Sequence, residues 1–292
     1  MSIAERLAKA DPGNAEWQRD LSVSHDRIGD VQRAQGDLAA ALASYRASLA
    51  IAERLAAADP GSGAGAGPGN AEWQRDLSVS HNKIGDVQRA QGDLAAALAS
   101  YHASLAIAER LAKADPGNAQ WQRDLSVSHN KIGDVHATQG DLAAALARYH
   151  VSLAIAERLA KADPGNAQWQ RDLSVSHDRI GDVQRAQGDL AAALASYHAS
   201  LAIAERLAAA DPGSRAGAGP GNAEWQRDLS VSHNKIGDVH ATQGDLAVAL
   251  ARYRASLAIA ERLAAADPGN AEWQRDLSVS HERIGDVQRA QG

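Results

Sequence analysis

The apolar side chains near the start of the chain recur with the period of an α-helix. In residues 15–35 they are Trp17, Leu21, Ile28 and Val31, and their spacings of four, seven and three place them on one stripe. Residues 38–58 carry a second stripe, formed by Leu38, Leu42, Tyr45, Leu49, Ala52 and Leu55. The pattern therefore predicts two amphipathic helices, each buried along one side.

Short turn signals between these segments predict how the two helices pack. Asn14 is a good N-cap for the first helix, and Gly36 suits the left-handed position that ends it. Asp37 can cap the second helix at once. Because only Gly36 and Asp37 separate the helices, we expect an antiparallel hairpin.

The hairpin recurs along the whole chain, and its tryptophans measure the repeat. They lie at positions 17, 73, 121, 169, 225 and 273, so the period is 48 residues with eight more inserted twice. Residues 3–140 also match residues 155–292 almost residue for residue, which indicates duplication of a three-repeat block. A fixed period in this range is typical of a solenoid, in which stacked units share a continuous core.

We therefore predict an all-α protein, an α-solenoid with a right-handed superhelix, as one array over residues 1–292. Part of a second helix lies at residues 3–10, and units start at residues 14, 70, 118, 166, 222 and 270. Two Gly-rich inserts, near residues 62–69 and 214–221, have the composition of flexible linkers.

The hairpins are incomplete at both ends, and we expect the apolar stripe of the last helix to lack its partner. Its residues are Trp273, Leu277, Ile284 and Val287, and no second helix follows them. This fits either a fragment of a longer array or ends that pair head to tail as a homo-oligomer.

Composition narrows the classes of function. The net charge of −6 provides no basic field for nucleic acid, and the lack of cysteine removes disulfides and thiolate sites. No apolar run approaches the roughly 18 residues that a membrane span needs. Because the N-terminal residues also match the repeat instead of a signal peptide, we expect a cytoplasmic protein.

A glycine inside the first helix of each unit predicts close packing. Gly29 and its equivalents occupy a position where glycine costs about 1 kcal/mol relative to alanine. Its presence in all six copies indicates that another group presses against the backbone, although inheritance by duplication is the alternative. Ala41 on the second helix offers a matching flat surface.

Residues 28–52 resemble a tetratricopeptide repeat. The Leu-Gly pair of that family, its turn, its small residue and its aromatic residue have counterparts in Ile28-Gly29, Gly36-Asp37, Ala41 and Tyr45. His25 and Gln32 stand where the family has tryptophan and tyrosine, and the proline that closes the second helix is missing. The resemblance therefore implies an elongated, 48-residue variant of the repeat.

No catalytic constellation follows from the pattern. The six histidines at the position of His25 would be spaced about 10 Å apart, the distance between packed helices, which is too wide to share a metal ion. Ser24 adjoins His25, but neighbours on a helix do not face each other. We expect no catalytic residue, no metal and no cofactor, and we expect the histidines and aromatic rings to serve packing.

The resemblance implies instead a concave groove, lined by the first helices of successive units, that holds peptide segments. Carried over by position, the groove residues of the first unit are Val23, Asp26, Asp30, Arg33 and Ala34. Those of later units are Asn82, Asp86, Arg89, Asn130, Asp134, Asp178, Asp182, Arg185, Asn234 and Asp238. This mixture of charges predicts a polar or basic peptide as partner, not nucleic acid and not a membrane.

The leading hypothesis is a non-enzymatic scaffold that binds protein or peptide segments in this groove. Two alternatives stay open. One is a self-assembling structural array that pairs through its uncapped ends, and the other is a regulatory arm of a larger signalling protein.

Overall fold

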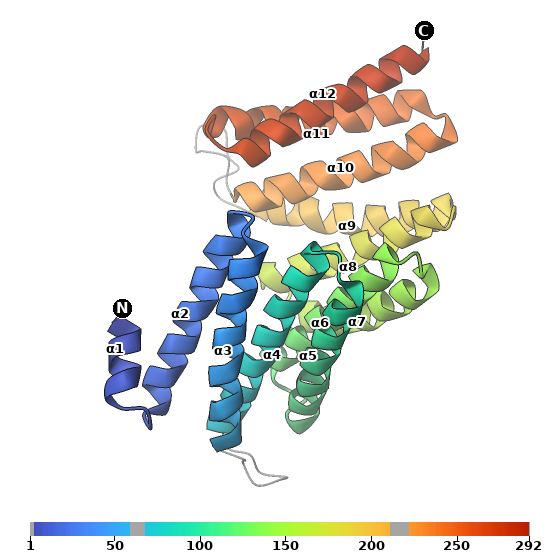
Figure 1. Cartoon of the computed structure of the whole chain (residues 1–292). Coiled ribbons are helices and arrows are strands. Elements are labelled where there is room, and N and C mark those ends of the chain that lie inside the picture. The colour runs from blue at the N-terminus through green and yellow to red at the C-terminus, as the bar shows by residue number, and fades with distance from the viewer. Residues whose placement is uncertain (1–2, 59–67, 211–221, 292) are drawn as a thin grey trace. The chain divides into compact units, whose positions relative to one another are not determined.

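The computed structural model describes residues 3–58, 68–210 and 222–291, and these residues form helices joined by short turns (Figure 1). The chain divides into two compact units, Met1–Ser152 and Leu153–Gly292, and each unit is described by itself. The boundary coincides with the duplication, because a shift of 152 residues carries the first unit onto the second. Of the two Gly-rich inserts, residues 62–67 and 214–221 lie outside the described residues.

Unit 1 is a stack of helical hairpins. Its helices are α1 (Ile3–Ala10), α2 (Ala15–Ala34), α3 (Leu38–Ala58), α4 (Pro68–Ala90), α5 (Leu94–Ala114), α6 (Ala119–Thr138) and the first half of α7 (Leu142–Ala162). We call the first helix of each hairpin the A helix (α2, α4, α6) and the second the B helix (α3, α5, α7). The A helices α2 and α4 pack on their own B helices, and α3 and α5 also pack on the A helix that follows.

Unit 2 repeats this arrangement. It holds the second half of α7, then α8 (Ala167–Ala186), α9 (Leu190–Ala210), α10 (Ala223–Gln243), α11 (Leu246–Ala266) and α12 (Ala271–Gln291). Figure 1 shows α9, α10, α11 and α12 lying side by side in chain order, with α8, α10 and α12 as the A helices. The described residues contain no strand, so the predicted all-α repeat fold is confirmed. The continuous array, the handedness and the curvature stay predictions.

The predicted caps define the ends of the hairpin helices. The side chain of Asn14 accepts a hydrogen bond from the backbone N–H of Trp17 at 3.1 Å. Gly36 ends the A helix at a φ of 82°, in the left-handed region that favours glycine. The Asp37 carboxylate then accepts from the N–H of Ala40 at 3.0 Å and starts the B helix.

The apolar core lies between each B helix and the A helix that follows it. In unit 1, Ile84 and Val87 of α4 form a cluster with Ala41 and Tyr45 of α3. In unit 2 the equivalent cluster joins α9 to α10 and consists of Ala193, Tyr197, Leu201, Ile236 and Val239. The predicted apolar stripes are therefore the contact surfaces between successive hairpins.

The first A helix departs from this pattern. Ile28 and Val31 of α2 are 49% and 57% exposed, whereas their equivalents Ile84 and Val87 are buried. The helix that packs before α2 is α1, which has only eight residues.

The last A helix corrects the expectation that its apolar residues lack a partner. Val287 is buried and clusters, together with Ile284, against Ala249 and Tyr253 of the preceding B helix, α11. The apolar stripe of an A helix faces the hairpin before it, so α12 finds its partner within unit 2.

The glycine inside the A helices α2, α4, α6, α8 and α10 faces a tyrosine and not the predicted alanine. A Cβ added to Gly29 would lie 2.6 Å from Cε1 of Tyr45, and the same clash occurs at Gly85, Gly133, Gly181 and Gly237. Ala41 is fully buried, but against the next A helix. The tyrosine ring therefore packs directly on the A-helix backbone, and only glycine leaves room for it.

Substitution of this glycine should separate the steric effect from helix propensity. We predict that Gly181→Ala lowers the free energy of unfolding by about 1–3 kcal/mol, because the new methyl group must displace the ring of Tyr197. Gly285 is a matched control, because its nearest neighbour is Arg289 Nη1 at 3.5 Å and no tyrosine packs on it. There alanine should stabilise by about 1 kcal/mol. Urea unfolding of both variants is the measurement, and stabilisation by both substitutions would contradict the steric explanation.

Candidate functional site

The faces of the A helices carry a first row of ion pairs near their N-terminal halves. Arg19 Nε of α2 lies 2.6 Å from Asp76 Oδ2 of α4, and Arg75 Nε lies 2.5 Å from Asp124 Oδ2 of α6. Unit 2 has equivalent pairs, Arg171–Asp228 and Arg227–Asp276. The sequence analysis missed this row, although an Arg-Asp dipeptide at the same position of every copy was a visible signal.

A second row is centred on the acid that follows each packed glycine. The hydroxyl of Tyr45 donates a hydrogen bond to Asp30 Oδ1 at 2.7 Å, and Lys83 Nζ of the next A helix lies 2.7 Å from the same oxygen. The ammonium of Lys83 also lies 5.2 Å from the centroid of the Tyr45 ring, within the range of a cation–π interaction. One carboxylate therefore joins its own B helix to the next hairpin.

The same arrangement holds in unit 2. The hydroxyl of Tyr197 donates to Asp182 Oδ1 at 2.7 Å, and Lys235 Nζ lies 2.7 Å from Asp182 Oδ2 and 5.4 Å from the ring centroid. Burial raises the pKa of the Tyr197 hydroxyl, and the adjacent charge of Asp182 raises it further. The raised pKa keeps the hydroxyl protonated, as its role as donor to Asp182 requires.

The predicted groove arginines pair with acids of the same row. Each arginine lies on the A helix that precedes the helix of its acid. Arg33 lies 3.8 Å from Asp86, Arg89 lies 3.4 Å from Asp134, and Arg185 lies 3.5 Å from Asp238. The acids themselves are held by the tyrosines of their own hairpins, at 2.7 Å for Asp86 and 2.8 Å for both Asp134 and Asp238.

Five of the predicted groove acids are thus paired with basic side chains of neighbouring hairpins. Asp30, Asp86, Asp134, Asp182 and Asp238 all form bonds that hold hairpins together, so they are not free carboxylates that wait for a basic ligand. Burial opposes ionisation of Asp30, but the hydrogen bonds from Lys83 and Tyr45 prevail and lower the pKa of its carboxyl. The prediction of a polar or basic peptide rested in part on these charges. Because the acids are paired within the fold, they give no separate support to a basic partner, and the class of peptide stays a prediction.

At another position of the predicted groove, the side chains have an oxygen atom without a hydrogen-bond partner. The side-chain Oδ1 atom at one unit position is buried and has no hydrogen-bond partner in five copies, namely Asp26, Asn82, Asn130, Asp178 and Asn234. Val23, one turn earlier on α2, is 40% exposed. The A-helix faces therefore carry a row of these residues next to valines, between two rows of ion pairs, with each Oδ1 atom turned away from solvent.

In unit 2 these groups line a cavity of about 390 Å³ on α8, α10 and α12. The structure brings four predicted groove residues together there, and these are Asp182, Arg185, Asn234 and Asp238. It adds residues that the prediction lacked, among them Ser230, Val231, Lys235, Asp276, Val279 and Arg283. The remaining predicted residues lie on α2, α4, α6 and α8, at the equivalent faces of their helices.

Among the five residues with an unpaired Oδ1 atom, Asp178 is the one whose carboxyl pKa is displaced furthest. Burial raises the pKa of its carboxyl to about 6, against the opposing effects of Lys235 and the hydroxyl of Ser200. Asp26 has the equivalent position in unit 1, and burial raises its pKa as well. The other three residues of the row are asparagines and carry no charge.

The histidines at the position of His25 are packing residues in the interior copies. His129 is buried, its Nδ1 atom has no partner, and burial lowers its pKa to about 4. Burial also lowers the pKa of His81, His177 and His233. Among the described residues no three His, Asp or Glu side chains converge as a metal site requires. Within the same ranges, no helix is long and apolar enough to cross a bilayer.

Comparison with known proteins finds a family match in two segments of the chain. Residues 137–187 and 241–290 match a family model described as the tetratricopeptide repeat, and both segments run from the end of one A helix through a B helix into the next A helix. The search of curated proteins found no match. Repeats of this family generally mediate protein–protein interaction and are typically non-enzymatic.

Three solved structures share the fold. BtubC (BKLC) from P. vanneervenii is 17% identical, with a TM-score of 0.63 and coverage of 91% of this chain and 87% of that one. The apo form of RapI is 14% identical, with a TM-score of 0.55 and coverage of 82% and 70%. A variant of a Podosopora anserina putative kinesin light chain with nearly identical TPR-like repeats is 14% identical, with a TM-score of 0.54 and coverage of 83% and 95%. At these identities the likeness establishes the fold alone.

The raised pKa of Asp178 predicts how the free energy of unfolding depends on pH. A carboxyl with a folded pKa of about 6 and a reference value of 3.8 stabilises the fold at low pH, and this stability is lost as pH rises from about 4 to about 6. Asp178→Asn should therefore raise the free energy of unfolding by about 2–3 kcal/mol at pH 7.5 and change it little at pH 4. Urea unfolding at both pH values tests this, with Asn234→Asp as the reverse substitution. Equal increments at the two pH values would show that ionisation of Asp178 is not the cause.

Proposed function

Since this chain carries tetratricopeptide repeats, we propose that it is a non-enzymatic scaffold whose A-helix face binds a peptide segment of a partner protein. One observation supports this site more than any other. The Oδ1 atoms of Asn82, Asn130 and Asn234, with those of Asp26 and Asp178, are buried acceptors without a donor. Buried polar groups in folded proteins are nearly always paired, so this recurring exception marks the row as a binding candidate. Because each Oδ1 atom is shielded from solvent, the proposal requires the side-chain amide or carboxylate to turn toward the peptide when it binds.

A peptide backbone supplies the donors that this row lacks. Neighbouring packed helices are about 8–10 Å apart, so acceptors on successive A helices recur at about that distance. A polyproline II helix repeats every three residues at about 3.1 Å each, and leaves all its N–H groups free. Every third N–H of such a peptide would therefore meet one acceptor, whereas in a β-strand every third residue points to the opposite side.

The charges around the row favour a partner without strong net charge. The cavity in unit 2 is lined by three acids, Asp182, Asp238 and Asp276, and by three cations, Arg185, Lys235 and Arg283. These groups neutralise each other in ion pairs, such as Asp182 with Lys235 at 2.7 Å and Asp238 with Arg283 at 3.1 Å. Breaking such a pair to bind a charged side chain would cost more than the new contact returns.

Two valines complete the surface. Val231 and Val279 line the same cavity from α10 and α12, and they provide apolar contact for small side chains between the backbone contacts. The self-assembling array and the regulatory arm stay predictions, as does the assignment of residues 1–292 to one array.

The double variant Asn82→Ala and Asn130→Ala, on neighbouring A helices of unit 1, tests the proposed site. Peptides are first selected on the unaltered protein from a displayed random library, and their affinities are then measured by fluorescence polarisation. Loss of two hydrogen bonds of about 1 kcal/mol each should weaken binding of a peptide held by unit 1 about 30-fold. The free energy of unfolding should stay constant or rise slightly, since the removed acceptors have no partner in the fold.

Two controls sharpen this test. The double variant Arg46→Ala and His102→Ala changes exposed side chains on the B helices of unit 1 and should bind normally. N-methylation of every third peptide bond should abolish binding in one register only. Equal affinity of a selected peptide for both double variants, or failure to select any peptide, would count against the proposal. Substitution of Asp30 and its equivalents is a poor test, because it removes bonds that hold the hairpins together.

A further inference from the structure

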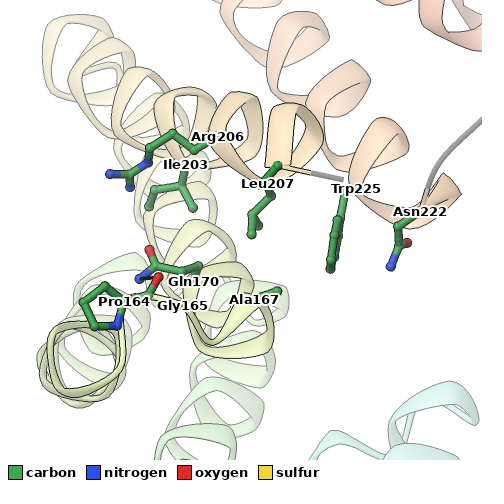
Figure 2. Close-up of a pocket in the computed structure, with 10 residues that line it drawn as sticks. Pro164, Gly165, Ala167, Gln170, Ile203, Arg206, Leu207, Asn222 and Trp225 are labelled. Carbon is green, nitrogen blue, oxygen red and sulfur yellow. Dashed lines mark hydrogen bonds between the residues drawn. The ribbon is translucent and has the colours of Figure 1, made fainter. Parts of the chain in front are cut away.

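Unit 2 contains a second, more apolar cavity that shares no residue with the A-helix site. Its volume is about 560 Å³, and it lies where the C-terminal end of α9 meets the N-terminal ends of α8 and α10. Figure 2 shows Ile203, Leu207 and Trp225 on one side of the cavity and Pro164, Gly165, Gln170 and Ala167 on the other. Its other lining residues are Arg206, Ala210 and Asn222.

The same residue types form an apolar cluster at the α5–α6 junction of unit 1, where the connection is short. There Ala71, Ile107 and Leu111 are buried together, with Trp121 packed against them. That junction runs directly from the end of α5 at Ala114 to the start of α6 at Ala119. The α9–α10 junction has a longer connection, from Ala210 to Ala223, as does its duplicate between α3 and α4, and the residues at the same repeat positions, Ala167, Ile203, Leu207 and Trp225, line a cavity.

The rim of the cavity carries a cation that has no partner among the described residues. In unit 1 the equivalent arginines are used, because Arg54 donates to Gln18 Oε1 at 3.3 Å and Arg110 donates to Gln74 Oε1 at 2.6 Å. Arg206 makes no such bond with Gln170, whose amide instead donates to the carbonyl of Ala160 at 3.1 Å. Figure 2 places the guanidinium of Arg206 at the edge of the cavity.

We propose that this cavity binds a medium-chain fatty carboxylate. The alkyl chain would occupy the space between Ile203, Leu207 and Trp225, and the carboxylate would pair with Arg206 at the rim. The volume lies within the range of roughly 300–1,000 Å³ that is usual for small-ligand pockets, and the walls are mostly aliphatic, as an alkyl chain requires. A guanidinium matches the two oxygens of a carboxylate.

Calorimetric titration of the full chain with octanoate tests the proposal, and octan-1-ol serves as the uncharged analogue. Octanoate should bind at one site per chain, and shortening to hexanoate should weaken binding about fourfold for each methylene removed. Arg206→Gln should weaken octanoate binding about tenfold and leave octanol binding unchanged. Arg54→Gln and Arg110→Gln are the matched controls and should bind octanoate normally.

A second variant tests the cavity independently of the charge. Ala167→Leu places a larger side chain at the N-terminal end of α8, inside the cavity, and should abolish binding of octanoate and octanol alike. Unchanged binding of both ligands by Ala167→Leu would overturn the proposal. An equal loss of octanoate binding in Arg110→Gln and Arg206→Gln would also overturn it. Because no residue is shared with the A-helix face, either result leaves the peptide site untouched.

Discussion

The contact between the glycine of an A helix and the tyrosine ring of its B helix, made in α2, α4, α6, α8 and α10, sets the geometry of each hairpin and of its contact with the next. With no Cβ on Gly181, the ring of Tyr197 lies against the helix backbone and carries its hydroxyl to Asp182. That carboxylate, fixed on one side, accepts Lys235 from the next A helix, and the lysine also lies over the tyrosine ring. One close approach therefore positions a hydrogen bond, an ion pair and a cation–π contact, and it links packing within a hairpin to packing between hairpins.

The sequence predicted the helices, their caps and the hairpin because these depend on local signals: periodic apolar residues, Asn14, Gly36 and Asp37. It also showed that the glycine had to be packed against something. It did not identify the ring of Tyr45 as that partner, because a modest rotation of the B helix would have turned Ala41 to the same place. The ion pairs between hairpins could not be predicted from the sequence for a related reason. Arg19 and Asp76, or Asp30 and Lys83, lie in different repeats, so their pairing follows only from the register of stacked hairpins.

This register divides the polar residues of the A helices into two groups. Acids at the position of Asp30 are used inside the stack, although their abundance on one helix face suggested a surface for basic ligands. The row that includes Asn234 and Asp178 is left with unpaired oxygens, and only the structure distinguishes it from its paired neighbours. The proposed peptide binding therefore rests on a few uncharged or weakly acidic groups, in a surface whose charges are paired with one another.

A double-mutant cycle between Tyr197→Phe and Lys235→Met tests most directly whether one carboxylate joins the two contacts. Free energies of unfolding are measured for the unaltered protein, both single variants and the double variant. If Asp182 couples the hydroxyl to the lysine, the two losses should differ from additivity by about 0.5 kcal/mol or more, as expected for residues that share a partner. Additive losses, within about 0.3 kcal/mol, would show that the hydroxyl and the lysine act independently and would contradict the central role of this contact.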